Sequence, residues 1–137
     1  MKKAATLIGR ILLRHIFLLA GISKMGGCAA TQGWMEAMGV SGALLPLMIA
    51  LEIGAGFALI LGFQARLTAL GLAGFSIISA VIFHANLSDQ VQSIMFMKNF
   101  SIAGGLFYVA ALGAGEWSID SWIKQKGSDK PVKVATA

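Results

Sequence analysis

The sequence predicts an all-α membrane protein: a four-transmembrane-helix bundle with both termini on the cytoplasmic side. First, 57% of the 137 residues are hydrophobic and only 12% are charged, whereas about 25% charged residues is usual for soluble domains. Second, four apolar segments are each long enough to cross a hydrocarbon core about 30 Å thick, at about 1.5 Å per helical residue. Third, the basic residues gather in the two tails, which is typical of residues that set membrane topology.

The four expected spans cover residues 4–23, 43–63, 67–85 and 94–112. Pro46 falls in the first turn of the second span, where its missing N–H costs little. Lys2 and Lys3 before the first span resemble the start of a secretory signal peptide. Arg14 and His15 interrupt the apolar run that such a signal needs, so we expect an uncleaved membrane helix.

The length fits one transmembrane domain over residues 1–123, followed by a basic cytoplasmic tail over residues 124–137. Four crossings place both termini on one side, and only Lys24 and Lys98 then lie on the other. Because Lys and Arg are enriched in cytoplasmic loops, the terminal side is expected to be cytoplasmic. Its basic residues are Lys2, Lys3, Arg66, Lys124, Lys126, Lys130 and Lys133.

Two segments outside the spans are predicted to be short interfacial helices, although either could be an ordinary loop. Residues 31–38 place Trp34 and two methionines on one face, and Gly39 would end that helix. Ser118 can cap a second helix that carries Trp122 into the headgroup zone. Glycines inside the spans are expected to let the helices approach closely. They are Gly54, Gly56, Gly71, Gly74, Gly104 and Gly105.

Several functional classes are disfavoured by the composition. The net charge of +5 comes mainly from the tails, so orientation in the membrane explains it better than nucleic-acid binding. The single cysteine, Cys28, excludes an internal disulfide and a CxxC redox pair. The two histidines lie on different expected helices and give no usual metal-ligand spacing. No metal, haem or flavin motif is visible.

Polar residues inside the expected spans are the candidates for function, since a charge at the bilayer centre costs about 2.5–3.5 kcal/mol on insertion scales. Counting at about 1.5 Å per residue from the outer boundary places Arg14 and Glu52 at similar depths, which predicts an ion pair between them, with Arg10 as an alternative partner. At about 100° per residue, one stripe of the first span should face the bundle interior. That stripe contains Arg10, Arg14, Phe17, Gly21 and Lys24.

Above the ion pair we expect a pocket that opens on the outer side, with Trp34 as a possible cover. Its edge would be formed by Lys24, His84, Lys98 and Asn99, and together with Arg14 and Glu52 these residues form the predicted ligand site. A purely structural interpretation stays open. A buried ion pair can fix helix register, Lys24 and Lys98 can extend to the interface, and His84 can contact headgroups.

Five segments resemble the DoxX family of small bacterial inner-membrane proteins. They are residues 17–24 (FLLAGISK), 51–56 (LEIGAG), 83–84 (FH), 97–106 (MKNFSIAGGL) and 113–120 (GAGEWSID). The resemblance extends from Arg10 to Asp120 and implies a four-helix bundle in the inner membrane. Related proteins form the membrane subunit of thiosulfate:quinone oxidoreductase, and others associate with membrane redox complexes.

With this resemblance, the first functional hypothesis is a redox-associated subunit that binds a quinone or a similar amphiphile. His84 and Lys98 would hydrogen-bond a quinone oxygen, Glu52 would help to carry protons, and a membrane redox partner would supply electrons. The second hypothesis is an accessory or assembly protein without catalysis. A small-molecule transporter built from inverted subunits is disfavoured by the strong charge bias. Whether the chain forms a homo-oligomer stays open.

Overall fold

A computed structural model describes residues 1–128, and these residues form helices and connecting turns. The helices are α1 (Lys2–Gly26), α2 (Cys28–Ala37), a 3-10 turn η1 (Gly42–Leu44), α3 (Leu45–Leu61), α4 (Ala65–Phe83), α5 (Gln90–Leu112) and α6 (Ile119–Ser128). Four of them, α1, α3 with η1, α4 and α5, are long and apolar enough to cross a bilayer, which confirms the predicted spans. Residues 124–128 of the predicted tail continue α6, and its remainder lies outside the described residues.

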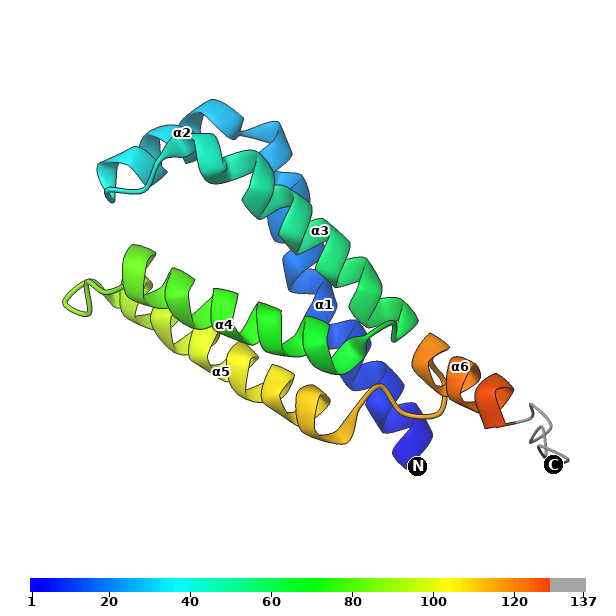
Figure 1. Ribbon diagram of the computed structural model, residues 1–137. Coiled ribbons are helices and arrows are strands. Elements are labelled where there is room, and N and C mark those ends of the chain that lie inside the picture. The colour runs from blue at the N-terminus through cyan, green and yellow to red at the C-terminus, as the bar shows by residue number, and fades with distance from the viewer. Residues whose placement is uncertain (129–137) are drawn as a thin grey trace, which may run out of the picture.

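Two antiparallel helical hairpins build the bundle (Figure 1). One consists of α1 and α3, and the other of α4 and α5. The hairpins lie close together near the chain termini and diverge toward the opposite end, where α2 and the turn between α4 and α5 lie. The N-terminus and α6 lie at the same end, as four crossings require. We call this the terminal end, and the opposite one the distal end.

The two short helices also follow the prediction. α2 begins at Cys28, three residues earlier than expected, and Gly39 follows it with a φ of +78°, a conformation that favours glycine. The hydroxyl of Ser118 accepts a hydrogen bond from the backbone N–H of Ser121 at 3.2 Å, so Ser118 caps the start of α6. Both helices lie beside the membrane-spanning hairpins and not within them.

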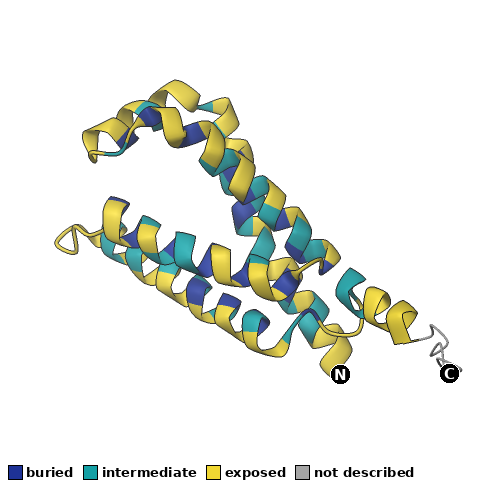
Figure 2. Cartoon of the chain, in the orientation of Figure 1, coloured by how far each residue is buried: buried dark blue, intermediate teal, exposed yellow. Residues whose placement is uncertain are grey.

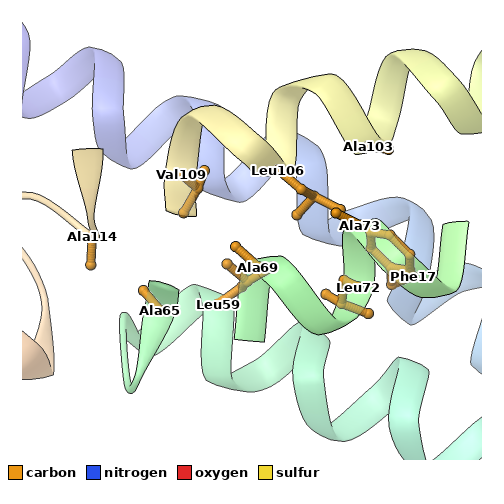
Figure 3. Packing of buried hydrophobic residues seen from close by; sticks show 10 residues of the cluster. All are labelled: Phe17, Leu59, Ala65, Ala69, Leu72, Ala73, Ala103, Leu106, Val109 and Ala114. Carbon is orange, nitrogen blue, oxygen red and sulfur yellow. The ribbon is translucent and has the colours of Figure 1, made fainter. Parts of the chain in front are cut away.

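The main core lies between the hairpins (Figure 3). Alanines on α4 and α5 let these helices approach closely, and Phe17 of α1 and Leu59 of α3 pack against them. A second, smaller cluster at the distal end joins α2 to α3 and α4 through Met35, Leu45 and Phe83. Most other apolar side chains are exposed on the outside of the helices (Figure 2). That pattern fits a bundle surrounded by lipid, in which close packing replaces the hydrophobic drive.

Glycines at helix contacts fulfil part of the prediction made for them. A Cβ added to Gly56 would lie 2.9 Å from the Leu18 side chain, and one added to Gly105 would lie 2.9 Å from the Leu13 side chain. A Cβ added to Gly21, on the buried stripe of α1, would lie 2.7 Å from the Ile53 side chain. The prediction is wrong for four other glycines, because a Cβ there would meet nothing within 4 Å. These are Gly54, Gly71, Gly74 and Gly104.

At the terminal end, Arg10 joins α1 to α3 and to the segment before α6. Its side chain is only 1% exposed. One terminal nitrogen donates to the carbonyl oxygens of Leu59 and Ile60, at 3.2 and 3.3 Å, and the other donates to that of Trp117. The last carbonyls of a helix lack helical partners and carry partial negative charge. A buried guanidinium therefore finds suitable acceptors at the end of α3.

Asp120, near the start of α6, forms hydrogen bonds with the turn between α3 and α4. Its carboxylate accepts from the backbone N–H groups of Gln64 and Ala65, at 2.8 and 2.9 Å, and its own N–H donates to the carbonyl of Gly62. Gly62 has a φ of +65°, and an added Cβ would lie 2.4 Å from Arg10 Nη1. We refer to Arg10, Gly62 and Asp120, with their backbone partners, as the terminal network.

Candidate functional site

A small cavity of about 160 Å³ lies between the hairpins, toward the distal end. All four spanning helices contribute to its wall. Five of the six residues predicted for a ligand site line it, and Arg14 does not. The polar members are Lys24, Glu52, Ser79, His84, Lys98 and Asn99, and the apolar members include Phe17 and Phe75. We call this space the polar cavity.

The central feature of the polar cavity is an ion pair between α1 and α3. Lys24 Nζ donates to both carboxylate oxygens of Glu52, at 2.8 and 2.9 Å. Glu52 is only 3% exposed, so its charge has been taken almost fully out of solvent. A buried carboxylate needs such a partner, because an unpaired charge inside a membrane is costly.

The predicted Arg14–Glu52 ion pair is therefore wrong, and so is the alternative with Arg10. Gly21 packs beside Glu52 and Ile53, whereas Gly56 packs beside Leu18. Glu52 is thus level with Gly21, seven residues beyond Arg14, which is about 10 Å along the helix. Lys24 lies about one helical turn beyond Gly21, and its long side chain spans that distance to reach Glu52. The Nε atom of Arg14 is buried and has no hydrogen-bond partner among the described residues.

The depth estimate failed because of the start of α3. The expected spans were aligned at Lys24 and Ala43, but α1 continues to Gly26, and the first residues of α3 pack against α2 instead of α1. The prediction of which residues of α1 face the bundle interior is largely correct. Arg10, Phe17 and Gly21 are the buried residues of that helix, and Lys24 reaches the cavity.

At the distal end of the cavity, His84 is held by two neighbours. Its Nδ1 lies 2.7 Å from Oε1 of Gln92 on α5. Because an amide oxygen only accepts, Nδ1 donates this bond, and Nε2 takes no part in it. Trp34 of α2 stacks on Phe83 with 4.8 Å between ring centroids, and it lies 5.8 Å from the His84 ring. Trp34 therefore lies beside His84 at this end of the cavity, and its role as a cover stays a prediction.

Lys98 and Asn99 on α5 complete the wall. Lys98 lies eight residues after the start of α5, about 12 Å along the helix. Its side chain is exposed, and no carboxylate among the described residues lies within 4 Å of its ammonium group. Asn99 donates one hydrogen bond to the carbonyl of Met95 in its own helix, at 3.0 Å. The cavity thus contains one neutralised pair and one further cation.

The sequence analysis missed several residues of this site, and three of them are informative. Ser79 and Phe75 line the cavity from α4, and Gln92 orients His84. A hydroxyl within an apolar span was a visible signal for Ser79. Gln92 could have been found only with the true start of α5, where Asp89 caps the helix through the backbone N–H of Gln92. Within residues 1–128, no three His, Cys, Asp or Glu side chains are grouped to hold a metal ion.

Comparison with known proteins identifies the family. The family model described as DoxX matches residues 5–85, which is more than half of the chain. The chain belongs to the DoxX family. It is similar to the inner membrane protein YqjF of Escherichia coli (strain K12), with 46% identity over 126 residues, 92% of this chain and 97% of that protein. It is also similar to the inner membrane protein YphA of the same organism, with 35% identity over 121 residues, 83% of this chain and 86% of that protein. No solved structure matches.

This DoxX-family chain is a multi-pass inner-membrane protein, as the four spans and the two relatives show together. The residues matched by the DoxX model include α1 to α4 and therefore Lys24, Glu52 and His84 of the cavity. Lys98 and Asn99 lie beyond the matched residues, on α5, but within the wider similarity to YqjF, which covers 92% of the chain.

Proposed function

We propose that this DoxX-family protein is a redox-associated membrane subunit that binds a quinone, or a similar amphiphile with a ring head, in the polar cavity. The observation that carries the proposal is the cavity itself: a ring-sized space inside the membrane span, lined by an ion pair, an oriented histidine and a lysine that has no carboxylate partner within residues 1–128. Polar groups at this depth are expensive and usually mark ligand or proton pathways.

The size and chemistry of the cavity fit a quinone head. An apolar cavity of about 150 Å³ takes up a benzene molecule, and the polar cavity measures about 160 Å³. The Lys98 ammonium is a donor suited to a quinone oxygen, and Nε2 of His84 is an acceptor suited to a quinol hydroxyl. Phe17 and Phe75 line the same space.

The Lys24–Glu52 pair supplies a group that can exchange protons beside the ligand. Under this proposal the chain binds and orients the ligand, and a membrane redox partner exchanges electrons with it. The single cysteine offers no dithiol for that step.

The proposal is tested by gentle purification from native membranes, solvent extraction, and mass spectrometry of the bound small molecules. Wild type is compared with Glu52→Gln and His84→Ala. Glu116→Gln is the matched control, because Glu116 is an exposed carboxylate paired with Lys3 at the terminal end. We expect a near-stoichiometric quinone in wild type and in the control, and its loss in both cavity variants.

Bulk phospholipid alone, unchanged by all three substitutions, would overturn the quinone proposal. It would favour the accessory or assembly role, in which the protein packs against another membrane protein and the Lys24–Glu52 pair is structural.

We also propose that the terminal end faces the cytoplasm, so that the polar cavity lies nearer to the periplasmic side of the membrane. The charge bias supports this orientation, since Lys2, Lys3 and Arg66 all belong to the terminal end. Cys28 is exposed at the distal end and provides the test. A membrane-impermeant maleimide should label it in intact spheroplasts. Ser128→Cys in a Cys28→Ser background should be labelled only after lysis, and the reverse pattern would contradict the orientation.

A further inference from the structure

A second space begins where the polar cavity ends. An apolar groove of about 450 Å³ lies between α1 and α5. Leu12, Leu13 and Ile16 line it from α1, and Ile94, Met97 and Ile102 line it from α5. α1 packs mainly on α3, and α5 packs mainly on α4, so the two helices leave this groove open along the side of the bundle. Toward the terminal end it closes where Leu13 packs on Gly105.

The groove and the polar cavity adjoin each other and share part of their lining. Ile16, Lys98 and Ile102 line both spaces. At the distal end of the cavity, Trp34 stacks on Phe83 beside His84. A substituent on a head bound in the cavity would therefore leave between Ile16 and Ile102, past Lys98, and would enter the groove.

We propose that the groove holds the apolar chain of the ligand whose head occupies the polar cavity, and that the ligand enters sideways from the bilayer between α1 and α5. This inference rests on the proposed function and narrows its ligand to molecules with one ring-sized polar head and a flexible apolar chain. The cavity has room for the ring alone, and the nearly uncharged groove suits a chain that has just left lipid.

Lys98 lies at the junction of the two spaces and acts as a positioning residue. Its ammonium group is exposed to the groove and has no carboxylate partner among residues 1–128. A head that passes from the groove into the cavity would meet this donor first. The oxygen of the head would then satisfy a charge that the lipid cannot solvate.

The experiment separates the head from the chain. One probe is a benzoquinone that carries a diazirine at the end of an alkyl chain, and the other is the same ring without the chain. The protein is reconstituted in phospholipid vesicles. Chain position is read by photolabelling and peptide mass spectrometry. Binding of the ring is read by quenching of Trp34 fluorescence in a background with Trp117→Phe and Trp122→Phe.

Ser101→Phe blocks the groove, because Ser101 is an exposed residue that lines it from α5. Ala111→Phe is the matched control, since Ala111 is a small, exposed residue of the same helix outside the groove. In wild type we expect labels within residues 12–16 and 94–102. Ser101→Phe should reduce this labelling at least about fivefold, a change typical of a lost contact of about 1 kcal/mol, and Ala111→Phe should leave it unchanged. The ring alone should bind all three proteins equally.

Two results would overturn the inference. Labels concentrated where the end of α1, α2 and α3 meet, around Met25 and Ile53, with the ring still bound, would place the chain elsewhere and leave the proposed function intact. Failure of the ring to bind wild type at all would overturn the proposed function and the inference with it.

Discussion

The terminal network and the polar cavity are two polar clusters at opposite ends of one bundle, and their hydrogen bonds differ in kind. In the terminal network, charged side chains bind backbone groups: Arg10 donates to three carbonyls, and Asp120 accepts from two N–H groups. In the polar cavity, the bonds between helices join side chains, as in the Lys24–Glu52 pair. The ammonium of Lys98 has no carboxylate within 4 Å among the described residues.

From this difference we infer that the terminal network stabilises the fold and that the polar cavity serves ligand binding. Charges that satisfy the backbone at helix ends remove the cost of groups that would otherwise be buried without partners. Polar groups that stay available inside a membrane contribute little to folding and are typically retained for a ligand. The terminal network should therefore be sensitive to substitution in stability measurements, and the polar cavity should be sensitive in binding measurements.

The largest loss of stability is expected from Arg10→Met. The substitution keeps an apolar side chain but leaves the carbonyls of Ile60 and Trp117 without their donor. Hydrogen bonds from charged groups contribute about 1.5–3 kcal/mol each, so the apparent free energy of unfolding should fall by about 3 kcal/mol. SDS titration in mixed micelles measures it. His15→Met, at an exposed site in the same helix, is the control and should change it by less than about 0.5 kcal/mol. Equal effects of the two variants would refute the structural role of Arg10.

A smaller loss is expected from Gly62→Ala. Gly62 has a left-handed φ, and the added Cβ would lie 2.4 Å from both Arg10 Nη1 and Ser118 Cβ. Backbone strain of this kind costs about 1–3 kcal/mol, so we expect a loss of about 2 kcal/mol in the same titration. Gly104→Ala is the matched control, because its Cβ would meet nothing within 4 Å and alanine favours helix. A neutral Gly62→Ala variant would show that the turn relaxes freely.

Asp120→Ala should cost about 1 kcal/mol, the usual effect of removing a side chain that caps the start of a helix. Both carboxylate oxygens accept from the first N–H groups of the turn into α4. Glu116→Ala removes only an exposed ion pair with Lys3, and such pairs contribute about 0–1 kcal/mol. Thermal unfolding in detergent compares the two variants. If Glu116→Ala lowers the midpoint as much as Asp120→Ala, the capping role is wrong.

The fold was largely predictable from the sequence because span length and helical periodicity are local properties. The stripe containing Phe17 and Gly21 and the cap at Ser118 follow from spacing alone. The register between α1 and α3 did not follow, because the packing of α2 against the start of α3 decides it. Counting residues from assumed boundaries therefore paired Glu52 with the wrong cation.

Five of the six polar residues that line the polar cavity were named from the sequence, because polar groups in an apolar span are conspicuous. The role of Arg10 was not predicted, since its partners are backbone carbonyls at the end of α3, and carbonyls leave no signal in a sequence. The role of Asp120 was not predicted for the same reason, because its carboxylate accepts from backbone N–H groups of a turn that is distant in the sequence.

The most direct test of the division between the two clusters is Lys98→Met, measured for both stability and ligand content beside Arg10→Met. Lys98 has no carboxylate partner in the part of the chain that the structure describes, so removing this cation from the membrane should leave the free energy of unfolding unchanged or raise it. The quinone recovered with the purified protein should fall about tenfold, as the loss of one charged hydrogen bond implies. A Lys98→Met variant as unstable as Arg10→Met, with its quinone content unchanged, would contradict the account.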